Sequence, residues 1–256
     1  MNNNEQSMRT YLSLCTEYYD WDKPIVSEQE LAFYMEFIKA AKGPILEPMC
    51  GTGRFLIPVL EAGFEIHGLD ASVYMLERLH EKCAKKNLNP TVWRQFIHEL
   101  DTKTAYDLML IPGGSFGLII SREEAKKSLQ KMYDHLLPGG KLVFEVETLN
   151  AVPERLGIWE GSVKSGDDVD SMIVLSTCAL PPKDQVGSII CRYELVQKGN
   201  LIKTEIENFQ LRLYNIEEMD ACLESVGFKK IKHYKAYDIS QVPTNEDKVI
   251  FYECEK

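Results

Sequence analysis

The sequence predicts an α/β protein with a doubly wound, mostly parallel seven-stranded sheet and an antiparallel β insertion after its fifth strand. Between residues 44 and 148, short apolar runs alternate with amphipathic segments. This order is typical of a parallel sheet whose two faces are covered by helices. From about residue 150 the pattern changes to consecutive strand-like runs, and the last two alternate apolar and polar residues, as in an antiparallel sheet with one wet face.

The first helix is expected at residues 27–41, because Ser27 can cap it with Glu30 three positions later. A strand at 44–48 then leads into a glycine turn. Pro58 falls in the second turn of the next helix, where it predicts a local distortion. In chain order the expected elements are helix 53–62, strand 64–70, helix 72–87, strands 91–97 and 106–112, helix 122–137 and strand 141–148.

Three consecutive strands are expected in the insertion, at residues 171–180, 188–197 and 201–214. A helix from Asn215 to Gly227 and strands at 229–237 and 248–255 complete the large sheet. We therefore expect one domain over residues 1–256. Residues 1–42 would form an N-terminal lid and helix. The insertion, at about 151–214, would lie over the carboxyl ends of the strands, where ligands bind in such sheets.

The turn in ILEPMCGTGRF (45–55) combines two glycines with a preceding acid, Glu47. A glycine turn between a strand and a helix brings a nucleotide against the backbone. Glu47 would repel the pyrophosphate of a dinucleotide, and Leu56 stands where the dinucleotide fingerprint has a third glycine or alanine. S-adenosylmethionine carries a sulfonium and an ammonium instead, and a carboxylate stabilises both, so Glu47 favours that ligand.

Asp70, at the end of the second expected strand, is placed to accept ribose hydroxyls. Two plainer interpretations stay open. Glu47 could be a surface acid at a strand end, and Asp70 could cap the following helix.

These segments resemble the class I S-adenosylmethionine-dependent methyltransferases of small-molecule type. The resemblance covers about residues 40–150 and implies a Rossmann-like methyltransferase fold with S-adenosylmethionine as cofactor. The segments that carry it are LEPMCGTGR (46–54), GLDASVYML (68–76), FIHELDTKTAYDLMLIPGGSFGLI (96–119), LLPGGKLVFEVET (136–148) and, in the tail, LRLYNIEEMDACLESVGFKKIKHY (211–234).

The resemblance assigns residues to each part of the cofactor. They are Glu47, Gly51 and Gly53 for the methionine part, Asp70 for the ribose, Ala71 and Met75 for the ribose and adenine, Phe96 and Ile97 for the adenine edge, and Pro112 and Gly113 near the sulfonium. Tyr19 belongs to an aromatic N-terminal segment that would fold over the cofactor as a lid, or else pack against the sheet edge.

Two positions depart from the family pattern. Met49 stands where the family often has glycine or alanine. Phe96 stands where the family often has an acid that accepts the adenine amino group, so adenine would be held by stacking, by the Ile97 amide or by Glu99.

Methyl transfer from a sulfonium is an in-line displacement with a neutral leaving group, so positioning can supply much of the rate. The sequence accordingly names no catalytic residue. The acceptor would be an N or O atom of a small molecule. Candidate acceptor contacts are Tyr18, Ser115, Arg192 and Arg212.

Composition narrows the partners. The formal net charge of −10 disfavours nucleic acid, whose binding depends on Lys and Arg. No apolar run reaches the ~18 residues that span a bilayer, and the polar first ten residues lack a signal-peptide core. The scattered cysteines contain no C-x-x-C pair, and no His/Asp cluster has metal-ligand spacing. We expect a cytoplasmic protein without a metal. Its oligomeric state stays open, with a homodimer among the alternatives.

Two other functions remain. One is an NAD-dependent oxidoreductase on a similar fold, against which Glu47 and Leu56 count. The other is a non-catalytic S-adenosylmethionine binder, which the departures at Met49 and Phe96 leave open.

Overall fold

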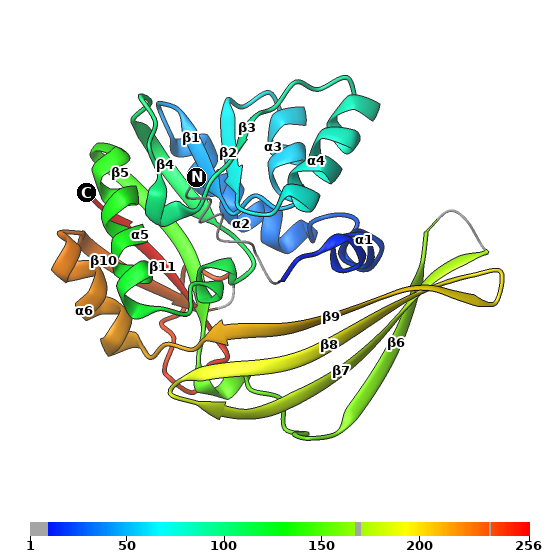
Figure 1. The fold of residues 1–256 in the computed structure, drawn as a ribbon. Helices are drawn as coiled ribbons and strands as arrows, with labels where there is room; N and C mark the ends of the chain where they lie inside the picture. Colours follow the sequence, from blue (N-terminus) through cyan, green and yellow to red (C-terminus); the bar gives the residue numbers. More distant parts are fainter. Residues whose placement is uncertain (1–9, 167–169, 236) are drawn as a thin grey trace, which may run out of the picture.

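The computed structural model describes residues 10–166, 170–235 and 237–256. Residues 1–9 of the expected lid, and residue 236, lie outside the described residues. Two sheets organise the chain, a large one and a smaller one that extends below it in Figure 1.

The large sheet has seven strands in the order β10-β11-β5-β4-β1-β2-β3. The strands β1 to β5 pair in parallel, and β11 pairs antiparallel to both β5 and β10. The predicted doubly wound, mostly parallel sheet is confirmed. Its strands are β1 (Ile45–Pro48), β2 (Ile66–Asp70), β3 (Thr91–Arg94), β4 (Tyr106–Ile111), β5 (Leu136–Glu147), β10 (Lys229–Lys235) and β11 (Val249–Glu255).

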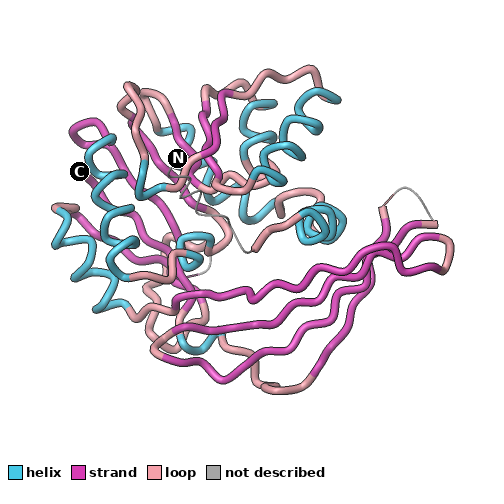
Figure 2. Tube along the Cα trace, in the orientation of Figure 1, coloured by secondary structure: helices cyan, strands magenta, loops and turns pink. Residues whose placement is uncertain are grey.

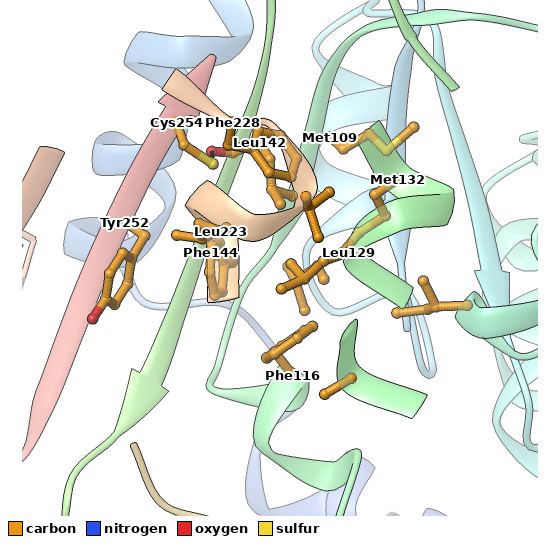
Figure 3. Close-up of a cluster of buried hydrophobic side chains, with 14 of the residues drawn as sticks. Met109, Phe116, Leu129, Met132, Leu142, Phe144, Leu223, Phe228, Tyr252 and Cys254 are labelled. Carbon is orange, nitrogen blue, oxygen red and sulfur yellow. Dashed lines mark hydrogen bonds between the residues drawn. The ribbon is translucent and has the colours of Figure 1, made fainter. Parts of the chain in front are cut away.

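Helices cover both faces of this sheet (Figure 2). The helices α2 (Glu28–Ala40), α3 (Leu56–Glu61) and α4 (Val73–Lys85) pack on one face, and α5 (Arg122–His135) and α6 (Ile216–Val226) pack on the other. Each face has its own apolar core: the first core lies under α2, α3 and α4, and the second lies under α5 and α6. Side chains of a strand alternate between faces, so Ile45 lies in the first core and Leu46 in the second. Figure 3 shows part of the second core, where Leu129 of α5 and Leu223 of α6 approach the strands.

Four of these helices begin where the sequence predicts. Each starts after a residue whose side chain accepts the backbone amide three positions later, which satisfies an unpaired donor of the first turn. The capping residues are Ser27, Ser72, Ser121 and Asn215.

Helix α3 is shorter than expected. It begins at Leu56 rather than Gly53, so Pro58 lies in its first turn. The amides of Ile57 and Val59 donate to the carbonyls of Gly53 and Phe55, whereas Pro58 between them has no N–H to donate. This missing hydrogen bond is a local interruption at the start of the helix, as the sequence predicts.

The insertion contains four antiparallel strands, in the order β6-β7-β8-β9, where three were expected. The additional strand is β6, whose residues are almost all exposed and therefore carry no apolar alternation. Helix α1 (Ser13–Asp22) packs against this sheet and against α4 (Figure 1). The strands are β6 (Trp159–Ser165), β7 (Ser171–Lys183), β8 (Val186–Gln197) and β9 (Asn200–Arg212).

No helix within the described part of the chain has the length and apolar character needed to cross a membrane.

Candidate functional site

A cavity of about 410 Å³ lies at the carboxyl ends of the central strands. The ends of β1 and β2, the turn after β1 and the loop after β4 form its floor. Tyr19 of α1 and the β9 residues Asn208 and Gln210 also line it. Ligands of doubly wound sheets bind at this edge, so the insertion and α1 enclose the expected site.

Most of the candidate cofactor residues come together here. Glu47, Gly51 and Tyr19 line one end, and Asp70, Ala71 and Met75 line the cavity beside the start of α4. Phe96, Ile97 and Pro112 also line it, as does Ser115 among the candidate acceptor contacts.

The turn after β1 requires left-handed backbone at three positions. Gly51 and Gly53 have φ values of 54° and 76°, and Met49 has a φ of 62°. A Cβ atom at Gly53 would lie 3.0 Å from side-chain atoms of Ile57 and Leu79, so a glycine is needed here for packing of the turn against these residues. Gly53 is not part of the cavity lining. The left-handed φ at Met49 explains why glycine suits this position in similar sequences.

Glu47 is a buried acid of the cavity lining with an unpaired oxygen. It is 3% exposed, and within the described residues Oε2 has no hydrogen-bond partner. Burial raises the pKa of Glu47 well above its usual value, although the positive charge of Arg54 opposes the shift. A buried, unpaired carboxyl group is costly, so a cationic ligand group in the cavity would both pair with Glu47 and favour its ionised form. The cations of S-adenosylmethionine fit this requirement.

Asp70 is already held by the backbone. Its two oxygens accept hydrogen bonds from the Ser72 amide (2.8 Å) and the Gly51 amide (2.9 Å), which join the glycine turn to the start of α4. Burial raises the pKa of Asp70, and these amide hydrogen bonds oppose the shift. Each carboxylate oxygen has a further lone pair, so Asp70 can still accept hydroxyl groups of a ribose.

Sequence reasoning missed the ion pair between Arg54 and Glu30, which lies near Glu47. Arg54 binds Glu30 of α2 through two hydrogen bonds of 2.6 and 2.7 Å, and its Nε donates to the Tyr19 hydroxyl at 3.0 Å. The sequence places Arg54 in the LEPMCGTGR segment, but it indicates for Glu30 only a place in a helix cap. Because Glu30 neutralises Arg54 directly, Glu47 remains available to a ligand.

Phe96, the residue expected at the adenine edge, forms an aromatic pair within the cavity lining. The rings of Phe96 and His98 stack with centroids 5.4 Å apart, and both residues line the cavity with Ile97. Glu99 is exposed and does not line it. Strand β3 ends at Arg94 instead of residue 97, because the chain turns here into a short 3₁₀ helix, η1 (Ile97–Glu99).

Besides Gly53, four further candidates lie outside the cavity lining. Gly113 donates its amide to Glu145 Oε1 at 2.5 Å. The Tyr18 hydroxyl is 2.7 Å from Ser162 Oγ, between α1 and the insertion. Arg192 is exposed and lies over the Trp159 ring, whereas Arg212 is buried and donates to backbone carbonyls.

Comparison with known proteins agrees with this geometry. Residues 45–140 match a family model described as a methyltransferase domain. Residues 45–140 are therefore a methyltransferase domain, and the sheet that contains them has the Rossmann-like fold of S-adenosylmethionine-dependent methyltransferases.

Two proteins with similar sequences are glycine/sarcosine N-methyltransferases. The protein of Aphanothece halophytica is 31% identical over 135 residues, which cover 50% of this chain and 49% of the relative. That of Halorhodospira halochloris is 29% identical over 137 residues, covering 52% and 50%. The chain therefore matches about half the length of each of these relatives.

Solved structures share the fold of this chain over nearly its whole length. An S-adenosylmethionine-dependent methyltransferase from Clostridium acetobutylicum has a TM-score of 0.74 at 20% identity, covering 93% of this chain and 96% of the other. A sugar N-methyltransferase from Streptoalloteichus has a TM-score of 0.72 at 17% identity, covering 92% and 90%. The likeness includes the antiparallel strand set beside the seven-stranded sheet.

No group of three or more His, Cys, Asp or Glu side chains in the described residues could hold a metal ion.

Proposed function

We propose that this methyltransferase transfers a methyl group from S-adenosylmethionine to a nitrogen atom of a small-molecule amine. The observation that supports cofactor binding most directly is the buried, unpaired carboxyl of Glu47 in the cavity. The names of the glycine/sarcosine and sugar N-methyltransferases support nitrogen over oxygen as the acceptor atom.

In this proposal each part of the site has a role. Glu47 binds the cations of the methionine part, Asp70 binds the ribose, and the Phe96 ring stacks on adenine. When bound, S-adenosylmethionine supplies the activated methyl group. Tyr19 and the β9 residues exclude water above it, which favours a displacement that depends on alignment.

Calorimetry on the purified protein tests cofactor choice. We expect S-adenosylhomocysteine and S-adenosylmethionine to bind, and NAD not to bind. Glu47→Gln should weaken S-adenosylhomocysteine binding about ten- to hundredfold, because an ion pair of about 1.5–3 kcal/mol is lost. Glu99→Gln is the matched control, since this acid is exposed and does not line the cavity. Tight binding of NAD, with none of S-adenosylhomocysteine, would reject the proposal.

Turnover tests the acceptor. Formation of S-adenosylhomocysteine should be seen with at least one amine among glycine, sarcosine and glucosamine, and not with the matching hydroxy compounds glycolate and glucose. A protein that binds the cofactor but methylates none of the amines would be a binder, not the proposed enzyme.

We also propose that the protein acts in the cytoplasm and on free small molecules rather than nucleic acid. All seven cysteines are free, which suits a reducing compartment. The net charge of −10 opposes binding to phosphate backbones.

A further inference from the structure

The carboxyl group of Glu147 lies beside the loop that borders the cavity. Glu147 ends β5, and the loop after the parallel neighbouring strand β4 contributes Pro112 and Ser115 to the cavity lining. A Cβ atom at Gly114, in this same loop, would overlap with Glu147 Oε1. Gly114 has a φ of 70° and no side chain, and it therefore lets the carboxyl group lie directly against the loop.

Two neighbouring acids on β5 differ in their partners. Glu145 accepts hydrogen bonds from the Gly113 amide and the Tyr34 hydroxyl, so it holds the loop. Glu147 lies two residues later on the same face of the strand, and its buried Oε2 has no hydrogen-bond partner within the described residues. Because no hydrogen bond within the described residues uses this oxygen, it can accept one from a ligand group bound beside the loop.

The surroundings of Glu147 prepare it to exchange a proton near neutrality. Burial raises its pKa to about 7, and the positive charge of Lys23, at the end of α1, opposes the shift. Glu145, two residues earlier on β5, is a second charged group in electrostatic contact with Glu147. Lys23 also lies over the ring of Tyr19, which lines the cavity. The end of α1, the loop after β4 and the end of β5 thus converge at one side of the site.

We propose that Glu147 binds the ammonium form of the acceptor amine and removes its proton before methyl transfer. This inference rests on the proposed function, since it needs an amine as the acceptor.

The reaction is favoured by such a group at a pH below the pKa of the amine. An aliphatic amine is protonated at neutral pH and has no lone pair for attack. The ionised Glu147 pairs with the ammonium, and one N–H proton moves to Oε2, leaving a neutral amine with a free lone pair. A nitrogen–carbon bond then forms as the carbon–sulfur bond breaks, and the electron pair of that bond stays on sulfur. The methylated product carries away the positive charge, and Glu147 returns its proton to water. A base with a pKa near the working pH suits this task.

Glu147→Gln tests the role, with Glu154→Gln as a control at an exposed position. The acceptor is whichever of glycine, sarcosine and glucosamine the unmodified protein methylates fastest. We expect Glu147→Gln to lower kcat/KM about 10²–10⁴-fold at pH 7, while its affinity for S-adenosylhomocysteine stays within twofold. Glu147→Asp should restore part of the activity, because it keeps the carboxylate.

The pH profile separates a proton acceptor from a structural residue. For the unmodified protein, kcat/KM should rise through about pH 7 and fall above the pKa of the amine. For Glu147→Gln it should rise up to the amine pKa, so that the two proteins converge at high pH. A variant that is equally impaired at every pH would overturn the role as a base. Equal activity of both proteins would reject Glu147 altogether. Failure of the unmodified protein to methylate any amine would reject the proposed function itself.

Discussion

At the scale of single residues, hydrogen-bond partners divide the buried acids of the site into two classes. Asp70 accepts two backbone amides, and Glu145 accepts an amide and a phenol, so both hold loops in place. Among the residues that the structure describes, Glu47 and Glu147 each keep a buried oxygen without a hydrogen-bond partner. Because an unpaired buried oxygen costs stability, we assign the second class to ligand binding.

The buried Glu145 should make the free protein less stable as the pH rises. Burial raises its pKa to about 8 from an ordinary value of 4.5, against the opposing hydrogen bonds from Gly113 and Tyr34. The folded state therefore binds more protons than the unfolded state between these values. This contribution to stability is complete below about pH 4.5 and is lost as the pH rises through 8, by at most about 5 kcal/mol.

Urea unfolding between pH 5 and pH 8 measures this effect. Glu145→Gln keeps an oxygen that can accept both hydrogen bonds but cannot titrate, so its free energy of unfolding should fall less over this range. Glu154→Gln, at an exposed position, should behave as the unmodified protein does. A slope that is unchanged by Glu145→Gln would show that this carboxyl group is ionised in the folded protein.

Sequence reasoning found the site residues that occupy fixed places in the sheet. Glu47 and Asp70 are at strand ends, where the order of elements alone brings them to one edge. The partners of a side chain cannot be found from the order of elements. Glu30 meets Arg54 because α2 packs beside the turn, and Glu147 lies against the loop after β4 because Gly114 leaves space for its carboxyl group.

At the scale of elements, α1 depends on a distant strand for its cap. Its N-cap residue, Leu12, has no side chain that can accept a hydrogen bond. Instead, Glu207 of β9 accepts the amides of Tyr11 and Leu12 at 2.9 and 2.8 Å, and Glu205 accepts that of Leu14 at 2.7 Å. Carboxylates at a helix N-terminus also interact favourably with the helix dipole.

Glu207→Gln should therefore loosen α1. The amide side chain can accept only one of the two hydrogen bonds well, so we expect a loss of about 1–2 kcal/mol in the free energy of unfolding. Hydrogen exchange of the α1 amides should become faster. Glu194→Gln is the matched control, because register places Glu194 on the opposite face of the same sheet. Unchanged exchange in α1 would contradict this account of the cap.

Contacts between distant parts of the chain explain why neither α1 nor β6 could be predicted from the sequence. Local caps and apolar periodicity identified α2, α4, α5 and α6. The cap of α1 comes from residues almost two hundred positions away, and β6 is held by pairing with β7 rather than by burial of its side chains. A signal that exists only after folding is absent from a local pattern.

At the scale of the whole molecule, the described residues form three apolar cores. Two lie on opposite faces of the large sheet, and the third joins α1 to the insertion. The third core contains Leu14 and Tyr18 of α1 and Ile173 of β7. Helix α1 also carries Asp20, which binds Thr52 of the glycine turn and Lys82 of α4. The insertion is thereby coupled to the cofactor cavity through α1.

This coupling predicts that two equally destabilising core substitutions differ in their effect on ligand binding. Ile173→Ala and Leu223→Ala each truncate a fully buried side chain and should each cost about 2–5 kcal/mol. Ile173 supports α1, which carries Tyr19 into the cavity, whereas Leu223 lies on α6 in the core on the other face of the sheet. Calorimetry well below both unfolding midpoints should find S-adenosylhomocysteine binding weakened several-fold by Ile173→Ala and unchanged by Leu223→Ala. If both variants bind the ligand as the unmodified protein does, α1 does not link the insertion to the cavity, and the third core serves stability alone.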